Sequence, residues 1–277
     1  MKTKIMLALS LLGAATVAGA QLLRRSYRQN FTQDVIQLLS AAPAATERTF
    51  NYQQLSGLPE PVQRYFWHVL PEGYPYIRTV HLRHGGRFKT GVDADWTDIT
   101  GEQYFTTEPP GFIWLGQTRW FAARDQYVAG QGQLVVHLFS LIPVVDVRGS
   151  TVDEGELLRW LGESVWFPTN LLPSEQLEWS PVDDRSAQLQ FEQNGLTINY
   201  HVHFNDQDEI VRVETQRYMT PERQETWVGE LSDYQRINEV LVPTRIRATW
   251  KLPEGDHTYA DFRVKEIEYD RYGELNK

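Results

Sequence analysis

The sequence predicts a mainly β (α+β) fold: a strongly curved antiparallel sheet or half-open barrel, with N-terminal helices before it and one central helix packed on its concave face. From residue 76 onward, apolar and polar residues alternate with a period of two, which is typical of antiparallel strands with one solvated face. A single stretch, 154–173, interrupts this alternation with a helical apolar stripe followed by a proline-bounded aromatic turn. The absence of βαβ alternation and of a glycine-rich phosphate loop argues against a nucleotide-binding α/β enzyme.

Composition supports one β-rich domain and excludes several kinds of site. A chain of 277 residues is within the range of a single barrel or sandwich, and its nine Trp, 13 Tyr and 12 Phe favour strands and can fill a core or line a cavity. The formal net charge of −9, without clustered Lys and Arg, argues against a nucleic-acid binder. Because the sequence contains no Cys, disulfides, thiol nucleophiles, thiolate metal sites and a Cys-linked lipid are excluded.

Residues 1–25 are predicted to be a signal peptide or a membrane anchor. The run 5–23 is uncharged and largely apolar, has basic residues on both flanks, and is about as long as a membrane-spanning helix. The sequence Ala18-Gly19-Ala20 has the small-x-small form of a signal-peptidase site. Both alternatives stay open, as does the orientation of an anchor. In either case we expect an exported domain in the cell envelope, anchored in the membrane, or secreted or periplasmic after cleavage at Ala20.

Two helices are predicted before the sheet. The first spans 26–42, where apolar residues recur at helical spacing: Phe31, Val35, Leu38 and Leu39. A proline and an alanine-rich stretch follow, so 26–49 is predicted to be helix and linker. The second helix covers 58–66 and is entered through proline, with Pro61 in its first turn. Residues 50–277 are then predicted to form a single curved antiparallel β domain.

The predicted strands lie on both sides of the central segment. The first begins at Tyr76 and has an inward face that includes His84 together with Val80, Leu82, Gly86 and Phe88. Further strands before the central helix are predicted at 102–107, 112–116, 119–129 and 132–140. After the helix, strands are predicted on both sides of a hairpin turn at Asn194-Gly195, and then at 210–218, 224–234, 240–251 and 257–269.

The central segment combines an amphipathic helix with an aromatic turn. The helix, over 154–165, has an apolar stripe made of Leu157, Leu158, Leu161 and Val165. Its charged residues fall mostly on the other side, where Arg159 and Glu163 are expected to form a surface pair at i,i+4. Four large apolar residues follow, held between two prolines: Trp166, Phe167, Leu171 and Leu172. A solvated loop does not carry so many, so we expect them to pack on a concave surface.

Three motifs suggest chemistry, and each has a plainer explanation. His201 and His203 share a strand face at metal-ligand spacing, but the face is the wet one and no third ligand is evident, so surface histidines are expected. His84, followed by Gly85-Gly86, lies where a bulge is permitted; it is either a hydrogen-bonded core histidine or part of a cavity. Asp206-x-Asp208-Glu209 lacks the glycine of a calcium loop and is predicted to be a turn. No metal site is predicted.

Three stretches together resemble an uncharacterised bacterial envelope family known only as a domain of unknown function: LPEPVQRYF at 58–66, RWLGESVWFPTNLLP at 159–173, and the spacing Trp227…Asp233-Tyr234…Val242-Pro243. The resemblance covers residues 50 to 270 and implies no catalytic residue or substrate. The order of strands, helix and strands is similar to that of the LolA/LolB-like lipoprotein carriers, whose incompletely closed sheet wraps helices over an apolar cavity. By analogy, this second resemblance implies acyl-chain binding.

We expect a non-catalytic binding module for a lipid or another apolar ligand, without a cofactor. Two alternatives stay open: an enzyme with a pocket around His84 and Glu163, and a structural or partner-binding envelope domain. The membrane is an expected partner through 5–23 if that run is uncleaved, nucleic acid is not, and the oligomeric state is left open. The predicted ligand-binding residues have inward phase or lie in the aromatic turn: Phe88, Trp114, Trp120, Trp166, Phe167, Leu171, Tyr200, Trp250 and His84.

Overall fold

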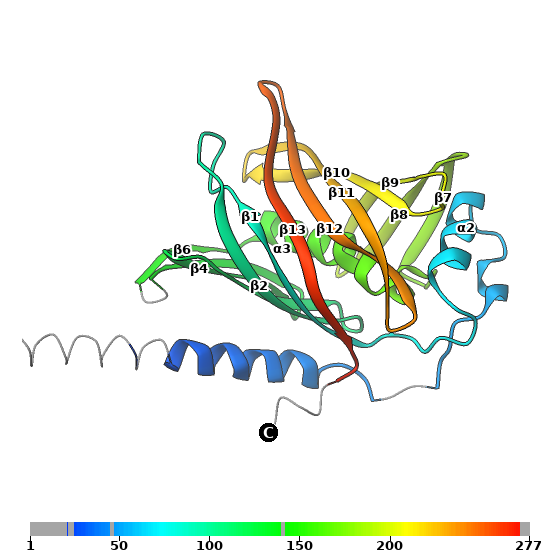
Figure 1. The fold of residues 1–277 in the computed structure, drawn as a ribbon, viewed down its shortest axis with the longest axis horizontal. Helices are drawn as coiled ribbons and strands as arrows, with labels where there is room; N and C mark the ends of the chain where they lie inside the picture. The colour runs from blue at the N-terminus through cyan, green and yellow to red at the C-terminus, as the bar shows by residue number, and fades with distance from the viewer. Residues whose placement is uncertain (1–20, 22–24, 45–46, 140–141, 272–277) are drawn as a thin grey trace, which may run out of the picture.

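An antiparallel sheet curves around a central helix (Figure 1). The computed structural model describes residues 21, 25–44, 47–139 and 142–271. Within them the sheet has 13 strands in the order β6-β5-β4-β3-β2-β1-β13-β12-β11-β10-β9-β8-β7, and its edge strands β6 and β7 do not pair with each other. The predicted fold, a curved antiparallel sheet that does not close into a barrel, is confirmed.

Each half of the sheet is a meander, and pairing of β1 with β13 joins the halves. The first half consists of β1 (Thr79–Phe88), β2 (Thr97–Thr106), β3 (Gly111–Gln117), β4 (Phe121–Val128), β5 (Gln131–Leu138) and β6 (Ile142–Val147). The second half consists of β7 (Leu177–Asp183), β8 (Ser186–Gln193), β9 (Leu196–Phe204), β10 (Ile210–Thr220), β11 (Arg223–Ile237), β12 (Val240–Leu252) and β13 (Gly255–Tyr269). In β9, buried residues alternate with half-buried ones, which is the predicted period of two.

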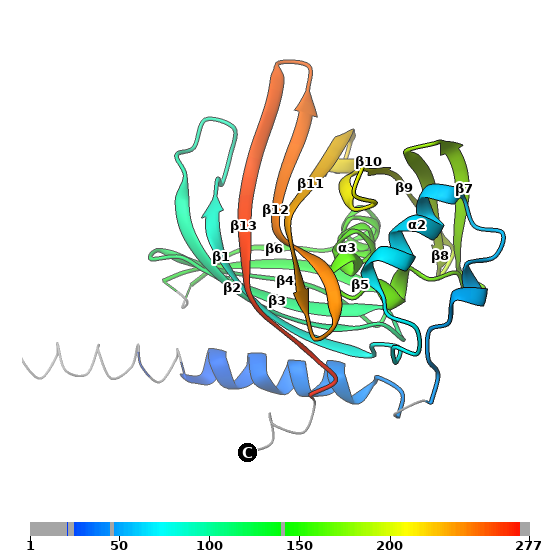
Figure 2. The same ribbon diagram turned by 45° about the vertical axis from the view of Figure 1, so that its right-hand side comes forward.

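The central helix α3 (Ser150–Glu163) carries the chain from one edge strand to the other across the concave face (Figure 2). Its predicted apolar residues Leu157, Leu158 and Leu161 are buried. Asp153 in the first turn accepts a 2.7 Å hydrogen bond from the backbone nitrogen of Gly132 in β5. Two short 3₁₀ helices, η2 (Ser164–Trp166) and η3 (Pro168–Leu171), follow and form the predicted aromatic turn.

The other helices lie outside the curve of the sheet or at its end, as Figures 1 and 2 show. The helix over 25–40 packs on the convex face, where a small separate core forms from Phe31, Val35, Leu38, Leu39, Tyr104, Ile113, Leu115 and Ala122. An ion pair of 2.7 Å between Arg124 and Asp34 fixes it there. The helix α2 (Glu60–Val69), preceded by η1 (Tyr52–Leu55), lies beside β8 and β12. Both predicted N-terminal helices are thus confirmed.

Two tight turns from opposite halves of the sheet meet, which shows how strongly the sheet curves. The predicted Asn194-Gly195 turn has positive φ at both residues, as a two-residue hairpin requires, and the β4–β5 turn at Ala129-Gly130 has the same pattern. A Cβ atom added to Gly130 would lie 2.7 Å from Nδ2 of Asn194. The two hairpin tips therefore touch.

The two edge strands were not predicted individually. All six residues of β6 are exposed, and in β7 only Leu177 and Trp179 are buried. An edge strand without a regularly buried face lacks the alternation that identifies a strand in a sequence. The predicted signal peptide or anchor, 5–23, lies outside the described residues apart from Gln21. Among the residues that are described, no helix has both the length and the apolar character needed to cross a bilayer.

Candidate functional site

The concave side of the sheet is filled with large aromatic side chains. Trp166, Phe167, Leu171 and Tyr200, all predicted ligand-binding residues, are each at most 2% exposed. Their polar atoms are satisfied: Trp166 Nε1 donates to the carbonyl of Pro243 at 3.0 Å, and the Tyr200 hydroxyl donates to that of Leu158 at 3.0 Å. The expectation that the aromatic turn packs on a concave surface is confirmed, and its members belong to a close-packed core.

His84 is the buried polar residue of strand β1. The register of β1 with β13 shifts between Arg83 and His84, the bulge that the following glycines permit, and His84 is only 3% exposed. Its Nε2 accepts a 2.8 Å hydrogen bond from Nε1 of Trp114. Space for the imidazole comes from Gly101 on β2, where a Cβ atom would lie 1.9 Å from Nε2. His84 is therefore a hydrogen-bonded interior histidine.

Arg159 of α3 sits between aromatic rings and carboxylates. Its guanidinium carbon lies 5.0 Å from the ring centre of Phe112 and 4.9 Å from that of Trp114. It also pairs with Glu163 at 2.9 Å and with Asp125 of β4 at 2.5 Å. The predicted i,i+4 pair is confirmed, but the expected surface position is wrong, because both side chains are about 15% exposed. The curved sheet covers the charged side of α3 as well as its apolar side.

Two more charged residues extend this group. Glu156 is 6% exposed, and its Oε1 lies 3.5 Å from Arg217 of β10. Burial, followed by the negative charge of Asp125, raises the pKa of Glu156 well above its ordinary value. Among the described residues, Asp125 Oδ1 and Glu156 Oε2 have no donor, which agrees with a raised pKa that keeps Glu156 protonated. We call Asp125, Glu156, Arg159, Glu163 and Arg217 the interior ion network.

With Glu156 protonated, the interior ion network is electrically balanced. Two guanidinium groups, of Arg159 and Arg217, then face two carboxylates, of Asp125 and Glu163. The second oxygen of Glu163 accepts a 2.6 Å hydrogen bond from the amide of Gln103. His84 and Glu163, the titratable pair considered from the sequence, are thus connected through Arg159, which contacts both the ring of Trp114 and the carboxylate of Glu163.

The remaining predicted ligand-binding residues lie apart from this network or at its margin. Phe88 and Trp250 are partly buried and have ring centres 5.9 and 6.3 Å from that of Tyr259. Trp120 is 53% exposed and contacts Phe139, at 6.1 Å between ring centres, in the turn region beyond β3. The structure therefore brings eight of the nine residues to the interior side and leaves Trp120 outside.

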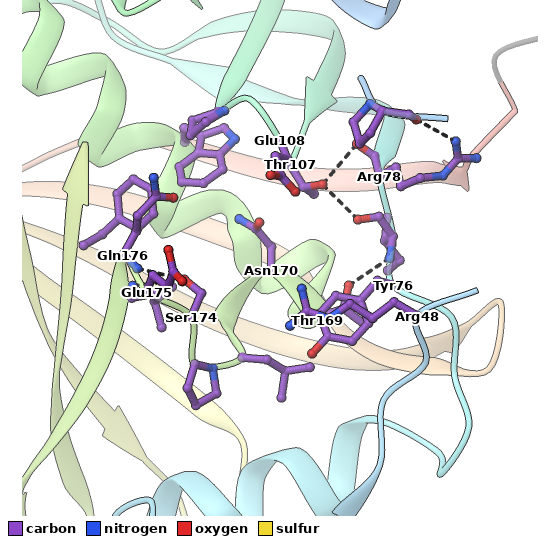
Figure 3. Close-up of a pocket in the computed structure, with 18 residues that line it drawn as sticks. Arg48, Tyr76, Arg78, Thr107, Glu108, Thr169, Asn170, Ser174, Glu175 and Gln176 are labelled. Carbon is purple, nitrogen blue, oxygen red and sulfur yellow. Dashed lines mark hydrogen bonds between the residues drawn. The ribbon is translucent and has the colours of Figure 1, made fainter. Parts of the chain in front are cut away.

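A pocket of about 670 Å³ opens at the end of the curved sheet, beside the aromatic turn (Figure 3). Its floor is apolar and comes from Trp160, Phe191, Leu172 and Leu177, all of them buried. Its rim is polar and consists of Arg48, Tyr76, Arg78, Thr107, Glu108, Ser174, Glu175 and Gln176. Figure 3 shows Asn170 between the Ser174–Gln176 side and the Arg48–Arg78 side.

The walls of this pocket are held together by hydrogen bonds. The backbone nitrogen of Ile77 donates to the hydroxyl of Thr169 at 3.0 Å, and the hydroxyl of Thr107 donates to the carbonyl of Ile77 at 3.1 Å. Trp160 Nε1 donates to the carbonyl of Thr106 at 2.9 Å. None of the nine predicted residues lines the pocket, because its walls come from segments far apart in the sequence that share no motif. Only the position of the proline-bounded turn could have indicated this pocket from the sequence.

The histidine and acidic motifs have local roles. His201 and His203 are half-buried, with ring centres 4.1 Å apart. Within the part of the chain that the structure describes, no three His, Cys, Asp or Glu residues gather as metal ligands would. The turn after β9 is closed by Asn205, whose Oδ1 accepts bonds from the backbone of Gln207 and Glu209. Asp208 pairs with Arg64 of α2 at 2.8 Å.

Comparisons with known proteins find a family and distant structural neighbours. Residues 48–262 match the model of DUF6544, a family of unknown function, which confirms the predicted membership of such a family. A domain from Vibrio parahaemolyticus described as an outer membrane lipoprotein-sorting protein is 11% identical, with a TM-score of 0.43, over 82% of this chain and 96% of that one. A LolA superfamily protein from Nitrosomonas europaea is 13% identical, with a TM-score of 0.36, over 75% and 91% of the two chains.

A DUF1329 family protein from Desulfovibrio piger is a third such neighbour. It is 11% identical, with a TM-score of 0.33, over 70% of this chain and 85% of that one. The predicted likeness to LolA-type domains is thus found among these neighbours, as a distant one. No curated protein sequence matches that of this chain.

Proposed function

The chain belongs to DUF6544, a family of unknown function, and we propose from the geometry of its pocket that it is a non-catalytic binding module for a lipid or another apolar ligand in the cell envelope. The observation that carries the proposal is the pocket of about 670 Å³ at the end of the curved sheet. Pockets for small ligands are typically about 300–1,000 Å³, apolar, and bounded by a few polar groups. The buried floor and polar rim of this pocket have that composition.

The pocket suits an amphipathic molecule better than a fully polar one. Trp160 and Phe191, whose ring centres are 5.2 Å apart, present aromatic surface to the apolar part of a ligand. At the rim, the guanidinium carbon of Arg48 lies 3.9 Å from the ring centre of Tyr76, and Arg78 donates to the carbonyl of Pro43 at 3.1 Å. These groups suit a polar head at the mouth. An acyl chain on the floor with its head at the rim satisfies both surfaces.

Ligand contact with the aromatic residues predicted from the sequence requires movement of the central segment. Trp166, Phe167 and Leu171 are packed in the core, so a ligand reaches them only if η2 and η3 shift. The pocket adjoins these residues through Asn170 and Leu172. We therefore place the first contact of the ligand at the pocket and the predicted residues deeper in the domain.

A binding role is favoured over catalysis at His84 and Glu163 because neither group has a free position that faces the pocket. The imidazole accepts from Trp114, and both oxygens of Glu163 accept from Arg159 and Gln103. Neither residue lines the pocket. A general acid or base needs a free position within reach of its substrate. Both oxygens of Glu163 are occupied, and the remaining ring nitrogen of His84, Nδ1, is buried without a hydrogen-bond partner among the described residues and does not face the pocket.

The test is co-purification of lipid, read together with a binding titration. The full chain is purified without detergent, its organic extract is analysed by mass spectrometry, and the delipidated protein is titrated with the fluorescent fatty acid cis-parinaric acid. We expect co-purified lipid and saturable binding. Gln176→Trp, which fills the mouth from an exposed rim position, should weaken binding by at least about tenfold, since the indole occupies the place where the ligand makes its first contact.

Gln207→Trp is the matched control, because Gln207 is exposed in the turn after β9 and does not line the pocket. It should bind the probe like the wild type. A lipid-free extract together with non-saturable probe binding would contradict the proposal and leave a structural or partner-binding domain. Equal weakening by both substitutions would contradict the placement of the ligand.

A further inference from the structure

Exposed apolar side chains are concentrated at one edge of the sheet. Of the twelve large apolar residues that are exposed in the described chain, seven lie between the residue before β4 and the end of β6: Trp120, Leu138, Phe139, Ile142, Val144, Val145 and Val147. We call these seven the apolar edge. Ile142 and Val144 are 57% and 56% exposed. Scattered exposed apolar residues are normal, but a contiguous group marks a surface that another phase or molecule covers.

Among the described strands, the backbone of this edge has a partner on one side only. The strand β6 pairs with β5 alone and is the last strand of the sheet. All six of its residues are exposed, and Asp146 is the single charged one among them. Proteins usually protect a free edge strand with charges, a bulge or a covering element, because an apolar edge promotes aggregation. Pro143 and a register shift against β5 give β6 some of this protection, but they leave four exposed Ile and Val side chains, which fit an edge that is covered in the cell.

The apolar edge lies beside the point where the N-terminal segment joins the domain. The ring of Tyr27, near the start of the helix over 25–40, lies 4.9 Å from that of His137, and His137 pairs with Pro143 of β6. In Figure 1 the start of this helix and the β4–β6 end of the sheet lie on the same side of the molecule. The 24 residues before the helix include the apolar run 5–23, which is long enough to span a bilayer.

Basic and aromatic groups lie around the apolar edge, although the whole chain carries a net charge of −9. Arg119 is exposed, and its guanidinium carbon lies 5.0 Å from the ring centre of Trp120. Arg25 and Arg28 are exposed at the start of the helix, and Arg28 also pairs with Glu102 at 2.9 Å. Tryptophan next to arginine is the combination enriched at the boundary between lipid headgroups and acyl chains, and arginine is attracted to anionic headgroups.

We propose that the apolar edge is a membrane-contact surface, which enters the headgroup region of an anionic bilayer to which the run 5–23 holds the chain. The boundary of the acyl chains covers the exposed side chains of β6, while the headgroups and their water form hydrogen bonds with its free backbone edge. Trp120 and Phe139 lie at the end of the hairpins and enter first. The contact is separate from the ligand pocket, whose lining residues include none of the seven.

The experiment uses the full chain in nanodiscs that hold one copy each, with or without phosphatidylglycerol. Because the sequence has no Cys, a single introduced Cys labels one position, and a nitrobenzoxadiazole fluorophore is attached at Ile142→Cys or Phe139→Cys. Val182→Cys is the matched control, since Val182 is 51% exposed on β7, the opposite edge strand. None of these side chains is buried, so the substitutions leave the core intact.

Quenching by nitroxide-labelled lipids measures contact with the bilayer. We expect quenching at positions 139 and 142 to exceed that at 182 on the order of threefold or more, and to be greater in discs with phosphatidylglycerol. Equal quenching at 142 and 182 would overturn the proposal. A blue-shifted emission at 142 that nitroxide lipids do not quench would overturn it too, because a protein surface would then cover the edge.

Discussion

The indole Nε1 of Trp114 donates a 2.8 Å hydrogen bond to Nε2 of His84, and both rings are buried on the concave side of the sheet. Because Nε2 is the acceptor, the neutral imidazole carries its proton on Nδ1. Burial lowers the pKa of His84 to about 3, and the positive charges of Arg159 and Lys265 act in the same direction. At physiological pH, His84 is therefore a neutral group that the surrounding strands hold in place.

Replacing His84 should reduce the acid sensitivity of the fold. The pKa of His84 is about 3 in the folded chain against an ordinary value of 6.5, so the unfolded chain binds more protons between these values. The stability that neutral His84 contributes is fully present above pH 6.5. It decreases by about 1.4 kcal/mol per pH unit as the pH falls from 6.5, and is lost as the pH passes through about 3. Urea unfolding at pH 7.5 and 4.5 should show a smaller difference for His84→Gln than for the wild type.

The exposed His68 is the control for this measurement. His68→Gln should keep the wild-type difference in the free energy of unfolding between the two pH values. An unchanged difference in His84→Gln would show that the imidazole at position 84 does not control acid sensitivity.

Glu156→Gln should gain stability relative to the wild type as the pH rises. Burial raises the pKa of Glu156 above its ordinary 4.5, so its contribution is fully present below pH 4.5 and is lost as the pH rises through the folded value. A glutamine keeps the uncharged form at every pH and still offers a donor to Asp125. Thermal unfolding between pH 5 and 9 should show the midpoint of the variant rising relative to that of the wild type.

Glu163→Gln, in the same interior ion network, should lower the stability of the domain. Both oxygens of Glu163 accept hydrogen bonds, from Arg159 and from Gln103, so an amide nitrogen there faces a donor. We expect a loss of roughly 2–3 kcal/mol in the free energy of unfolding at pH 7. If the two variants changed stability in the same direction and by the same amount at pH 8, the protonated state assigned to Glu156 would be wrong.

Gly101→Ala should destabilise the domain by disturbing the His84–Trp114 pair. An added methyl group would lie 1.9 Å from His84 Nε2, so the buried imidazole would have to move away from its partner Trp114. Such overpacking costs about 1–3 kcal/mol. Gly91→Ala is the control, because nothing lies within 4 Å of its Cβ position, and it should unfold at the same denaturant concentration as the wild type. Equal midpoints for both variants would contradict the close contact.

Val35→Asp should detach the helix over 25–40 without unfolding the sheet. Val35 is 1% exposed in the small core on the convex face, which is separate from the main core. A carboxylate there is costly to bury, so the helix should separate from the sheet. Hydrogen exchange should quicken at amides of 25–40 and stay slow in β9. Gln33→Asp, at an exposed position, is the control and should leave hydrogen exchange unchanged in both regions. If Val35→Asp instead made exchange faster throughout the domain, the two cores would unfold together.

Local sequence patterns predicted most elements of the fold. The period of two identified the strands around His84 and Tyr200, and the Asn194-Gly195 pair identified a hairpin turn, because alternation and positive φ are properties of neighbouring residues. The helical stripe of Leu157, Leu158 and Leu161 identified α3 for the same reason. The edge strand β6 was missed because both of its faces are exposed.

The sequence by itself thus determined the succession of helices and strands, the inward phase of His84 and the burial of the aromatic turn. The tertiary structure alone decided what lies opposite each residue. Arg159 and Glu163 are buried because the curvature of the sheet brings β2 and β4 against the charged side of α3, which a helical pattern cannot indicate. The pocket likewise depends on segments such as 76–78 and 172–177, distant in the sequence, which meet only when the curved sheet and the central segment pack together.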